Sequence, residues 1–553
     1  MATTHNKNVI FLLLFLIALV LVDIKARWTQ DCFDLEYAKA AAGSDNIDDL
    51  QQNNDVLETT EEKKEHSPPS EVIYHPIIKS EENEEKQEVV DGATASPELE
   101  KFQNNHVVQM TAVVSSPVLT DAELEYVLSR VKMGPELDEN CKIQKDLFFL
   151  KSSKTGSTTM MSIFQRFGLK YNSRFLMGEN RGGMAVNSRP VNLEDDCWLG
   201  KNIDGLKFDL SCNHLHWNKT VIDALMVDGY KSIGIAREPN SHFISSFNFY
   251  HNLMPKFTYM LNPSAPYNQK RRRVSSRKQL MSMKPSKEDI IVEMKEFLKN
   301  PWFYLSDMGN NSFAYMANVR PQLLFYGKSR NNVASYDQGL TREDVLDWIQ
   351  DIMAGFDLMM VLEYFDYSLA MMSLQFCIPV EDLVYIAVNQ RHETTENSAK
   401  KKPPLDDEDL QRLKELNWPD YLLYQALNTT FWRRVEFYGE EVVKERADKI
   451  IELSHQISSE CIDFEREGAN KLVDRVFLLE NKQDNSTCLQ LQFQGVRATK
   501  LFMVHQVEEL REMTNNKYEF CGPKIVYGEE AHNYLKWRDN YLRMYRAVKG
   551  DFD

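Results

Sequence analysis

Two short segments of this chain join an apolar stretch to residue types that bind phosphate groups. The first places Lys154, Gly156 and a run of hydroxyl residues directly after the apolar residues 147–150. Glycine permits a tight turn, and the N–H groups that begin the following helix attract an anion. The second holds Arg237, whose planar guanidinium can bind phosphate at two points, with Ser245 eight residues later. The two segments predict anion sites at the ends of two strands.

The residue order of the first segment differs from the common nucleotide-triphosphate loop. That loop reads G-x-x-x-x-G-K-[ST], with the lysine after the second glycine. Here the lysine precedes the glycine, in the order K-[ST]-G-[ST]-T. This order resembles the 5′-phosphosulfate loop of sulfotransferases that use 3′-phosphoadenosine 5′-phosphosulfate (PAPS). The resemblance implies these PAPS-binding residues: Lys154, Thr155, Gly156, Ser157, Thr158, Thr159, Arg237 and Ser245.

Further segments, in order between about residue 146 and residue 521, resemble the galactose-3-O-sulfotransferase family, which includes galactosylceramide sulfotransferase. They include Asn213-His214, Glu238-Pro239, Phe243-x-Ser245-Ser246-Phe247, Glu363-Tyr364-Phe365-Asp366-x-Ser368-Leu369, Glu381-Asp382-Leu383-Val384-Tyr385 and Asn428-Thr429-Thr430-Phe431-Trp432-Arg433-Arg434-Val435-Glu436. The resemblance implies an α/β, P-loop-like sulfotransferase fold with a central parallel sheet flanked by helices. It also implies transfer of sulfonate from PAPS to a glycan hydroxyl, such as the 3-hydroxyl of a galactose in a glycolipid or glycoprotein.

Sulfonate transfer makes three demands on a protein: it must hold the donor, neutralise the leaving phosphate and remove the acceptor proton. Lys154 is expected to neutralise the leaving group, and Arg237 with Ser245 to hold the 3′-phosphate. His214 is the predicted base, because an imidazole can accept a proton near neutral pH. His216, two residues on, is a second candidate. No cysteine and histidine cluster has zinc-ligand spacing, so no metal is expected.

One departure from the family leaves alternatives open. The family reads Lys-Thr-His-Lys-Thr where this chain has Ser152 and Ser153 between Lys151 and Lys154. Serine cannot take up a proton at neutral pH, so a changed acceptor or a reduced activity would follow if the family relies on that histidine. The alternatives are a uronyl or other glycosaminoglycan O-sulfotransferase, and a non-catalytic sulfotransferase-like protein that binds nucleotide or glycan.

The elements that would position these residues alternate between strands and helices. Strands are expected at 147–150, 208–210, 232–236, 358–362 and 384–388, and helices from Ser157, at 286–298, at 341–355 and across 418–457. Capping pairs Ser286/Asp289 and Thr341/Asp344 support two of the helices. The alternation favours a parallel sheet with ligand groups at the carboxyl ends of its strands.

The N-terminal segment predicts an attachment to a membrane. Fourteen apolar residues run from Val9 to Val22, fewer than the roughly 20 of a full span, but no clear cleavage site follows and Ile24 lengthens the run. We expect a cytoplasmic tail at 1–8, a signal-anchor helix at 9–24, an acidic flexible stem at 25–140 and a lumenal sulfotransferase domain at 141–553. A cleaved signal is the alternative. The family resemblance implies a single-pass type II protein of the Golgi membrane.

Charge and cysteine content agree with this division. The chain of 553 residues has a net charge of −17, and residues 33–140 alone hold 25 acidic and 8 basic residues. Eight cysteines and four Asn-x-Ser/Thr sequons suit an oxidising lumen, where structural disulfides are expected. The basic run at 270–278 lacks interleaved aromatic residues, so no nucleic-acid partner is expected. The sequence does not decide between a monomer and a homodimer.

Overall fold

The computed structural model describes most of the predicted lumenal part of the chain. It covers residues 117–137, 140–178, 185–190, 198–250, 286–299, 301, 341–386, 405–463, 485–492, 495–518, 538–539 and 542–550. These residues belong to one compact unit, Val113–Asp553. The predicted tail, the predicted anchor at 9–24 and the basic run at 270–278 lie outside the described residues. Within the described ranges, no helix is long and apolar enough to cross a membrane.

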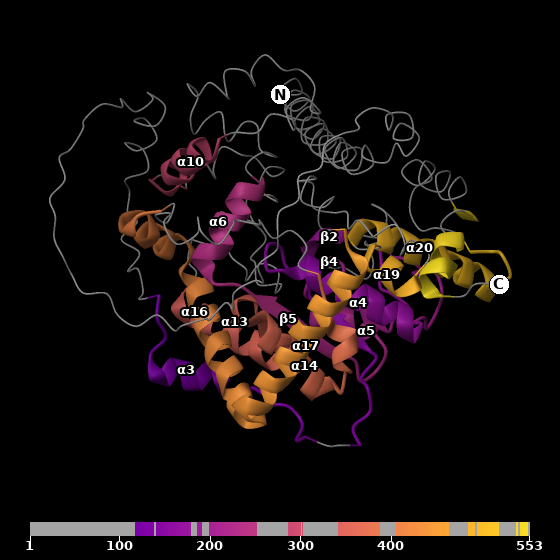
Figure 1. Cartoon of the computed structure of the whole chain (residues 1–553). Coiled ribbons are helices and arrows are strands. Elements are labelled where there is room, and N and C mark those ends of the chain that lie inside the picture. Colours follow the sequence, from indigo (N-terminus) through magenta and orange to yellow (C-terminus); the bar gives the residue numbers. More distant parts are fainter. Residues whose placement is uncertain are drawn as a thin grey trace, which may run out of the picture. The chain divides into compact units, whose positions relative to one another are not determined.

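Four parallel strands form the central sheet, at four of the five places where the sequence predicts strands. They are β1 (Leu147–Phe149), β3 (Leu210–Ser211), β5 (Lys231–Ala236) and β6 (Leu358–Val361), in the spatial order β3-β1-β5-β6. β1 pairs with β5 from Leu147 opposite Lys231, and β5 pairs with β6 as far as Ala236 opposite Val361. A second sheet pairs β2 (Ala185–Pro190) with β4 (His214–His216), also in parallel. The strands lie among the helices in Figure 1.

Helices cover both faces of the central sheet. Alternate side chains of each strand point to opposite faces, and both sets are apolar, so each face needs a covering layer. On β1, Leu147 and Phe149 join one hydrophobic core and Phe148 joins the other. The first core takes residues from α4 (Ser157–Tyr171), α14 (Phe365–Phe376), α17 (Glu440–Cys461) and α20 (Gly495–Met513). The second takes residues from α3 (Asp121–Leu128), α5 (Lys219–Leu225), α13 (Arg342–Gly355) and α16 (Asp407–Tyr438).

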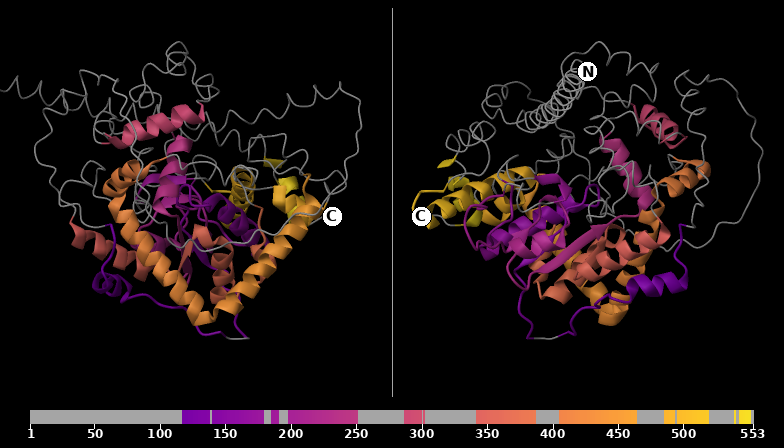
Figure 2. Two further views of the ribbon diagram at one scale, coloured as in Figure 1. Left: turned by 60° about the vertical axis from the view of Figure 1, so that its left-hand side comes forward. Right: turned by 180° about the vertical axis from the view of Figure 1, so that it is seen from behind.

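Two further helices, α6 (Pro239–Tyr250) and α10 (Lys287–Lys299), contact α16, and α19 (Ser486–Gln492) lies near the end of the described chain. Figure 2 shows α16 and α17 as two long helices that meet at an angle. The predicted helices at 286–298 and 341–355 are confirmed as α10 and α13. Their caps are confirmed too: Asp289 N donates to Ser286 Oγ over 3.0 Å, and Thr341 and Asp344 form a reciprocal capping box.

Some predicted boundaries are wrong. The strand expected at 208–210 lies at Leu210–Ser211. Residues 384–386 are irregular, because Tyr385 N donates to Ser454 Oγ of α17 over 3.1 Å instead of joining the sheet. The helical stretch expected across 418–457 is two helices, since Gly439 adopts a left-handed φ of 88° between α16 and α17.

The folded domain also begins before residue 141, within the predicted stem. Thr120 and Glu123 form a capping box that starts α3, and Val127 of α3 is fully buried in the second core. Arg342 Nε at the start of α13 donates to Glu123 Oε1 over 2.5 Å. The sequence predicts an acidic flexible stem here, but Glu123 caps a helix and pairs with an arginine.

Two disulfides confirm the expected use of cysteine. Cys141 pairs with Cys377, which joins the chain just before β1 to the end of α14, and Cys461 pairs with Cys488. Within the described residues Cys212 is the free thiol, and its burial raises its pKa to about 12. A thiol with so high a pKa is inert at neutral pH. The remaining cysteines lie outside the described residues.

The strand order locates the position where this sheet would bind a ligand. From β1 the chain passes to β3 on one side, and then to β5 on the other side of β1. In open parallel sheets, ligands bind beyond the carboxyl ends of the strands at such a reversal. The two predicted phosphate-binding segments follow β1 and β5, so both lie at this reversal.

Gly156 is expected to be essential for the turn after β1. Its φ is 72°, and a Cβ added there would lie 2.5 Å from Leu362 Cδ1. Gly156→Ala should therefore cost strain at a left-handed position plus overpacking, together about 2–4 kcal/mol of unfolding free energy. Gly205→Ala is the matched control, because Gly205 has the same φ of 72° with nothing within 4 Å. Urea unfolding of both variants measures the difference, and equal losses would contradict the Leu362 contact.

Candidate functional site

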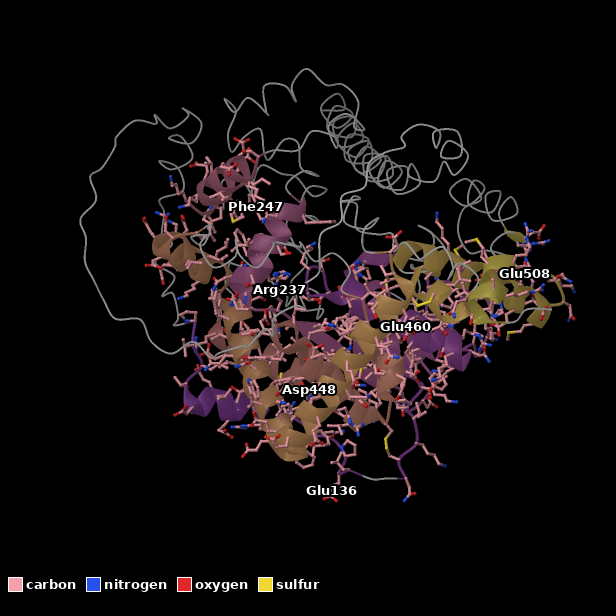
Figure 3. All side chains as sticks on the ribbon, viewed as in Figure 1. Glu136, Arg237, Phe247, Asp448, Glu460 and Glu508 are labelled. Atoms are coloured by element: carbon pink, nitrogen blue, oxygen red, sulfur yellow. A yellow bond between two sulfur atoms is a disulfide. The ribbon has the colours of Figure 1, made fainter. Side chains whose placement is uncertain are left out.

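The carboxyl ends of the four parallel strands bring the candidate residues together. Residues 151–156, here called the anion loop, follow β1, and His214 follows β3. Arg237 follows β5, and Glu363 lies in the short 3-10 helix Leu362–Tyr364 after β6. Figure 3 shows Arg237 at the end of α6 nearer the sheet, with Phe247 further along that helix. Sequence segments that are far apart therefore meet at one edge of the sheet.

Four consecutive carbonyl groups of the anion loop accept hydrogen bonds from side chains. The pairs are Lys151 O with His214 Nδ1 (3.0 Å), Ser152 O with Thr155 Oγ1 (3.3 Å) and with Ser157 Oγ, Ser153 O with His242 Nε2 (3.0 Å), and Lys154 O with Arg237 Nη1 (3.1 Å). A carbonyl oxygen carries partial negative charge and repels an anion. With these oxygens bound to protein donors, the N–H side of the loop is left to face a ligand.

The backbone of this loop is suited to an anion. Lys154 and Gly156 have left-handed φ values of 62° and 72°, and Gly156 is the N-cap of α4. The first N–H groups of a helix have no partner within it, and the helix dipole adds positive potential there. The turn therefore places the positive start of α4 directly after the loop.

The hydroxyl residues of the motif divide into two groups. Thr155 and Ser157 are buried and donate to Ser152 O, so their side chains build the loop. Thr158 is half-buried, and its hydroxyl has no partner among the described residues. Thr159 is buried at 7% exposure and its N–H donates to Gly156 O over 3.0 Å. Only Thr158 of these four presents a hydroxyl that is both accessible and unpartnered within the described structure.

Lys154 is half-buried, and its ammonium lies over an aromatic ring. Its Nζ is 4.1 Å from the centre of the Phe249 ring, and Phe249 is 54% exposed. Such a cation–π contact restrains a flexible lysine. Sequence reasoning did not single out Phe249. Its position one helical turn after Ser245 was the available signal, because residues four apart share a helix face.

His214 is fixed through both ring nitrogens by Lys151. Its Nδ1 lies 3.0 Å from Lys151 O, and its Nε2 lies 3.1 Å from Lys151 Nζ. A lysine ammonium can only donate, so Nε2 accepts and the ring hydrogen is on Nδ1. His214 is therefore held as the neutral tautomer with its Nε2 lone pair on a cation. Lys151 was a missed site residue, and the side chain of His216 lies outside the described structure.

Arg237 is half-buried beside two carboxylates. Burial lowers the pKa of its guanidinium, whereas Glu363 and Glu238 oppose that shift. Glu238 caps α6 by accepting from Asn240 N (2.9 Å) and Ser241 N (2.7 Å). The start of α6 is thus already capped by a carboxylate, which leaves side chains to bind an anion there. Ser245, half-buried in the second turn of α6, has a hydroxyl with no partner among the described residues.

Glu363 links three elements at this edge. Its Oε1 accepts from Glu238 N over 3.0 Å, and its Oε2 accepts from the Tyr424 hydroxyl of α16 over 3.1 Å. Burial and this carboxylate raise the pKa of Tyr424, so its hydroxyl stays protonated as a donor. The contact fixes the end of β5 to β6 and to α16. Sequence comparison placed Glu363 in a matching block but gave it no role.

The arrangement defines a parallel α/β protein with the anion loop at the topological reversal of its sheet. The sequence profile of the galactose-3-O-sulfotransferase family matches residues 105–270 and 278–477, so the chain belongs to that family. The profile covers all the candidate site residues. This result confirms the resemblance on which the predicted fold and site were based, and membership implies a sulfotransferase that uses PAPS.

Several curated relatives show the same affiliation at low identity. Galactosylceramide sulfotransferase of Mus musculus is 25% identical over 328 residues, or 58% of this chain and 65% of that protein. The Bos taurus counterpart is 26% identical over 330 residues, with the same shares. Galactose-3-O-sulfotransferase 2 of Mus musculus is 23% identical over 326 residues, or 57% of this chain and 70% of that protein. The chain thus spans 65% of the length of the galactosylceramide sulfotransferases it matches. No solved structure matches the chain.

Valine variants of Thr155 and Thr158 should distinguish a hydroxyl that stabilises the loop from a hydroxyl that contacts the ligand. Thr155→Val removes the donor to Ser152 O and should lower the unfolding free energy by about 1–2 kcal/mol, with nucleotide affinity largely kept in the folded protein. Thr158→Val removes a half-buried hydroxyl that has no partner among the described residues. It should weaken binding of 3′-phosphoadenosine 5′-phosphate with little loss of stability. Calorimetric titration and urea unfolding of both variants provide the comparison. The reverse pattern would assign the ligand contact to Thr155.

Proposed function

We propose that this chain transfers sulfonate from PAPS to the 3-hydroxyl of a galactose in a glycolipid or glycoprotein. The observation that carries the proposal is the hydrogen bond of 3.1 Å from Arg237 Nη1 to Lys154 O. This bond places the two predicted anion sites side by side, because the Arg237 guanidinium contacts the loop that carries the Lys154 ammonium. A donor with two separated phosphate groups matches such a paired site better than a single small anion does.

The residues of the loop suit the donor. PAPS, when bound, supplies an electrophilic sulfonate group and a phosphate leaving group. The N–H groups of the anion loop and the start of α4 hold its 5′ end, with Thr158 as a hydroxyl contact. Lys154 neutralises the charge that develops on the leaving phosphate. Arg237 and Ser245 hold the 3′-phosphate, and the fork of the guanidinium suits two-point binding.

The acceptor proton passes to His214 in this proposal. Neutral His214 has its lone pair on Nε2, which Lys151 Nζ contacts over 3.1 Å. The acceptor hydroxyl reaches Nε2 when Lys151 moves aside, and the nearby ammonium favours the neutral ring that a base requires. The two groups together keep His214 ready to accept one proton and fix which nitrogen accepts it.

The acceptor class and the location follow from relatives rather than from geometry. The relatives are named for galactosylceramide and for galactose 3-O-sulfation. We infer a galactose-terminated glycolipid or glycoprotein as acceptor, and a type II Golgi membrane protein whose stem and domain are lumenal. The two disulfides are compatible with an oxidising compartment.

Incubation of the full chain with sulfur-labelled PAPS tests the proposal. The acceptor panel contains β-galactosides, galactosylceramide and desulfated glycosaminoglycans, and the linkage of each labelled product is determined. Label at the 3-position of galactose is expected. Label confined to glycosaminoglycans would favour the uronyl alternative, and nucleotide binding without transfer to any acceptor would favour a non-catalytic protein.

Lys154→Ala should remove most turnover, by about 100-fold or more, while the fold and donor affinity are largely kept, because the charge acts chiefly on the leaving group. Arg237→Ala should instead mainly weaken binding of 3′-phosphoadenosine 5′-phosphate. Lys219→Ala is the matched control, since Lys219 is exposed and pairs only with Asp223 four residues on. Near-normal kcat in folded Lys154→Ala would reject the role of this lysine.

His214→Ala should lower kcat severely with little change in donor affinity. The decline of rate at acid pH, where a histidine base becomes protonated, should disappear in this variant. Lys151→Met provides the comparison, because it removes the cation from Nε2 while His214 remains, and it should move the acid limb of kcat/KM to higher pH. Full activity of His214→Ala would point to a different base.

A further inference from the structure

His242 is a buried histidine on α6 that contacts the anion loop. It is 1% exposed, and its Nε2 lies 3.0 Å from Ser153 O and 3.5 Å from Ser246 Oγ. A carbonyl oxygen can only accept, so Nε2 carries the ring hydrogen and donates it to Ser153. The sequence motifs gave His242 no role, and the reaction proposed above does not use it.

We propose that His242 is a positioning residue that sets the conformation of the anion loop at Lys154. The inference rests on the proposed function for its consequence, but the contact itself is independent of any ligand. Ser153 O and Lys154 N–H belong to one planar peptide unit, in which they point in opposite directions. Holding Ser153 O toward α6 therefore turns Lys154 N–H the other way, toward the side where an anion would bind.

The left-handed conformation of Lys154 explains why such a restraint is needed. A non-glycine residue at a φ of 62° is strained by about 1–3 kcal/mol, and it persists only where its surroundings hold it. His242 fixes the peptide unit before Lys154, and Arg237 fixes the unit after it through Lys154 O. The two donors enclose the strained residue. Loss of the His242 donor should allow Lys154 to relax to an ordinary conformation and displace its ammonium.

His242 does not compete with His214 as a base. Burial is the main cause that lowers the pKa of His242 to about 4. The bond to Ser153 opposes this shift, and the charges of Arg237 and Lys154 add to it. The ring is therefore neutral at physiological pH, and its one N–H is used by the loop. Because the ring is neutral at physiological pH, this donor does not repel the two neighbouring cations.

Replacement by the two amides tests the role. Glutamine can place its amide nitrogen near the position of Nε2, whereas asparagine is too short and reaches only the position of Nδ1. In the full chain, His242→Asn should weaken binding of 3′-phosphoadenosine 5′-phosphate and lower kcat, each by up to about 100-fold. His242→Gln should restore most of both. His242→Met, which keeps the apolar volume without a donor, serves as a second test variant that should resemble Asn.

Hydrogen exchange measured on the ligand-free protein separates this inference from the proposed function. Peptides covering residues 150–160 should exchange faster in His242→Asn and His242→Met, and close to wild type in His242→Gln. His505→Asn is the control: His505 of α20 stacks on Tyr545 at 4.1 Å, so its loss should cost stability without affecting the loop. Equal loop exchange and nucleotide affinity in the three His242 variants would overturn the inference. If the wild-type chain binds no nucleotide, but the His242 variants still show the expected differences in loop exchange, only the proposed function is rejected.

Discussion

The site depends on hydrogen bonds that hold the carbonyl oxygens of the anion loop, which carry partial negative charge, away from the ligand. Four carbonyl oxygens in succession, from Lys151 to Lys154, are bound by side-chain donors, and three of those donors come from segments more than 50 residues away in sequence. Each external donor belongs to a different segment: His214 to β4, Arg237 to the end of β5, and His242 to α6. The loop thus takes its shape from the tertiary structure, and a displacement of any of these segments would be transmitted to it.

The sheet makes this convergence feasible. Its strand order reverses at β1, so the segments after β1 and β5 become neighbours although about 80 residues separate them in sequence. Glu363 adds β6 and α16 to the same edge through its two carboxylate oxygens. The carboxylates of Glu363 and Glu238 also favour the charged form of Arg237, against the effect of its burial. The strands themselves are short, and their alternate side chains anchor two separate cores.

The sequence predicted most accurately those strands and helix caps that depend on residues close together in the chain. β5 and β6 are short apolar runs, and the α10 and α13 caps are paired side chains three residues apart, so each is visible within a few residues. The phosphate-binding segments were found because their spacing matches a family. The contacts of Lys151 with His214, and of His242 and Phe249 with the loop, were missed, since each depends on elements that meet only in three dimensions. The same reason explains residues 384–386, whose apolar sequence suggested a strand but whose N–H group bonds to a serine on α17.

Several hydroxyl residues of the motif stabilise the loop in the folded chain, although the motif suggests that they contact the ligand. Hydroxyls in K-[ST]-G-[ST]-T suggest ligand contacts, yet Thr155 and Ser157 turn theirs inward to Ser152 O, and Ser152 Oγ in turn donates to Ile235 O of β5 over 3.1 Å. Small hydroxyl residues suit this task because they satisfy buried carbonyls without filling the turn. Ser153, where the family carries a histidine, is itself buried and contributes its carbonyl as an acceptor. The identity of these side chains is therefore constrained first by the geometry of the loop, and the ligand meets mainly the backbone and the cations that this geometry presents.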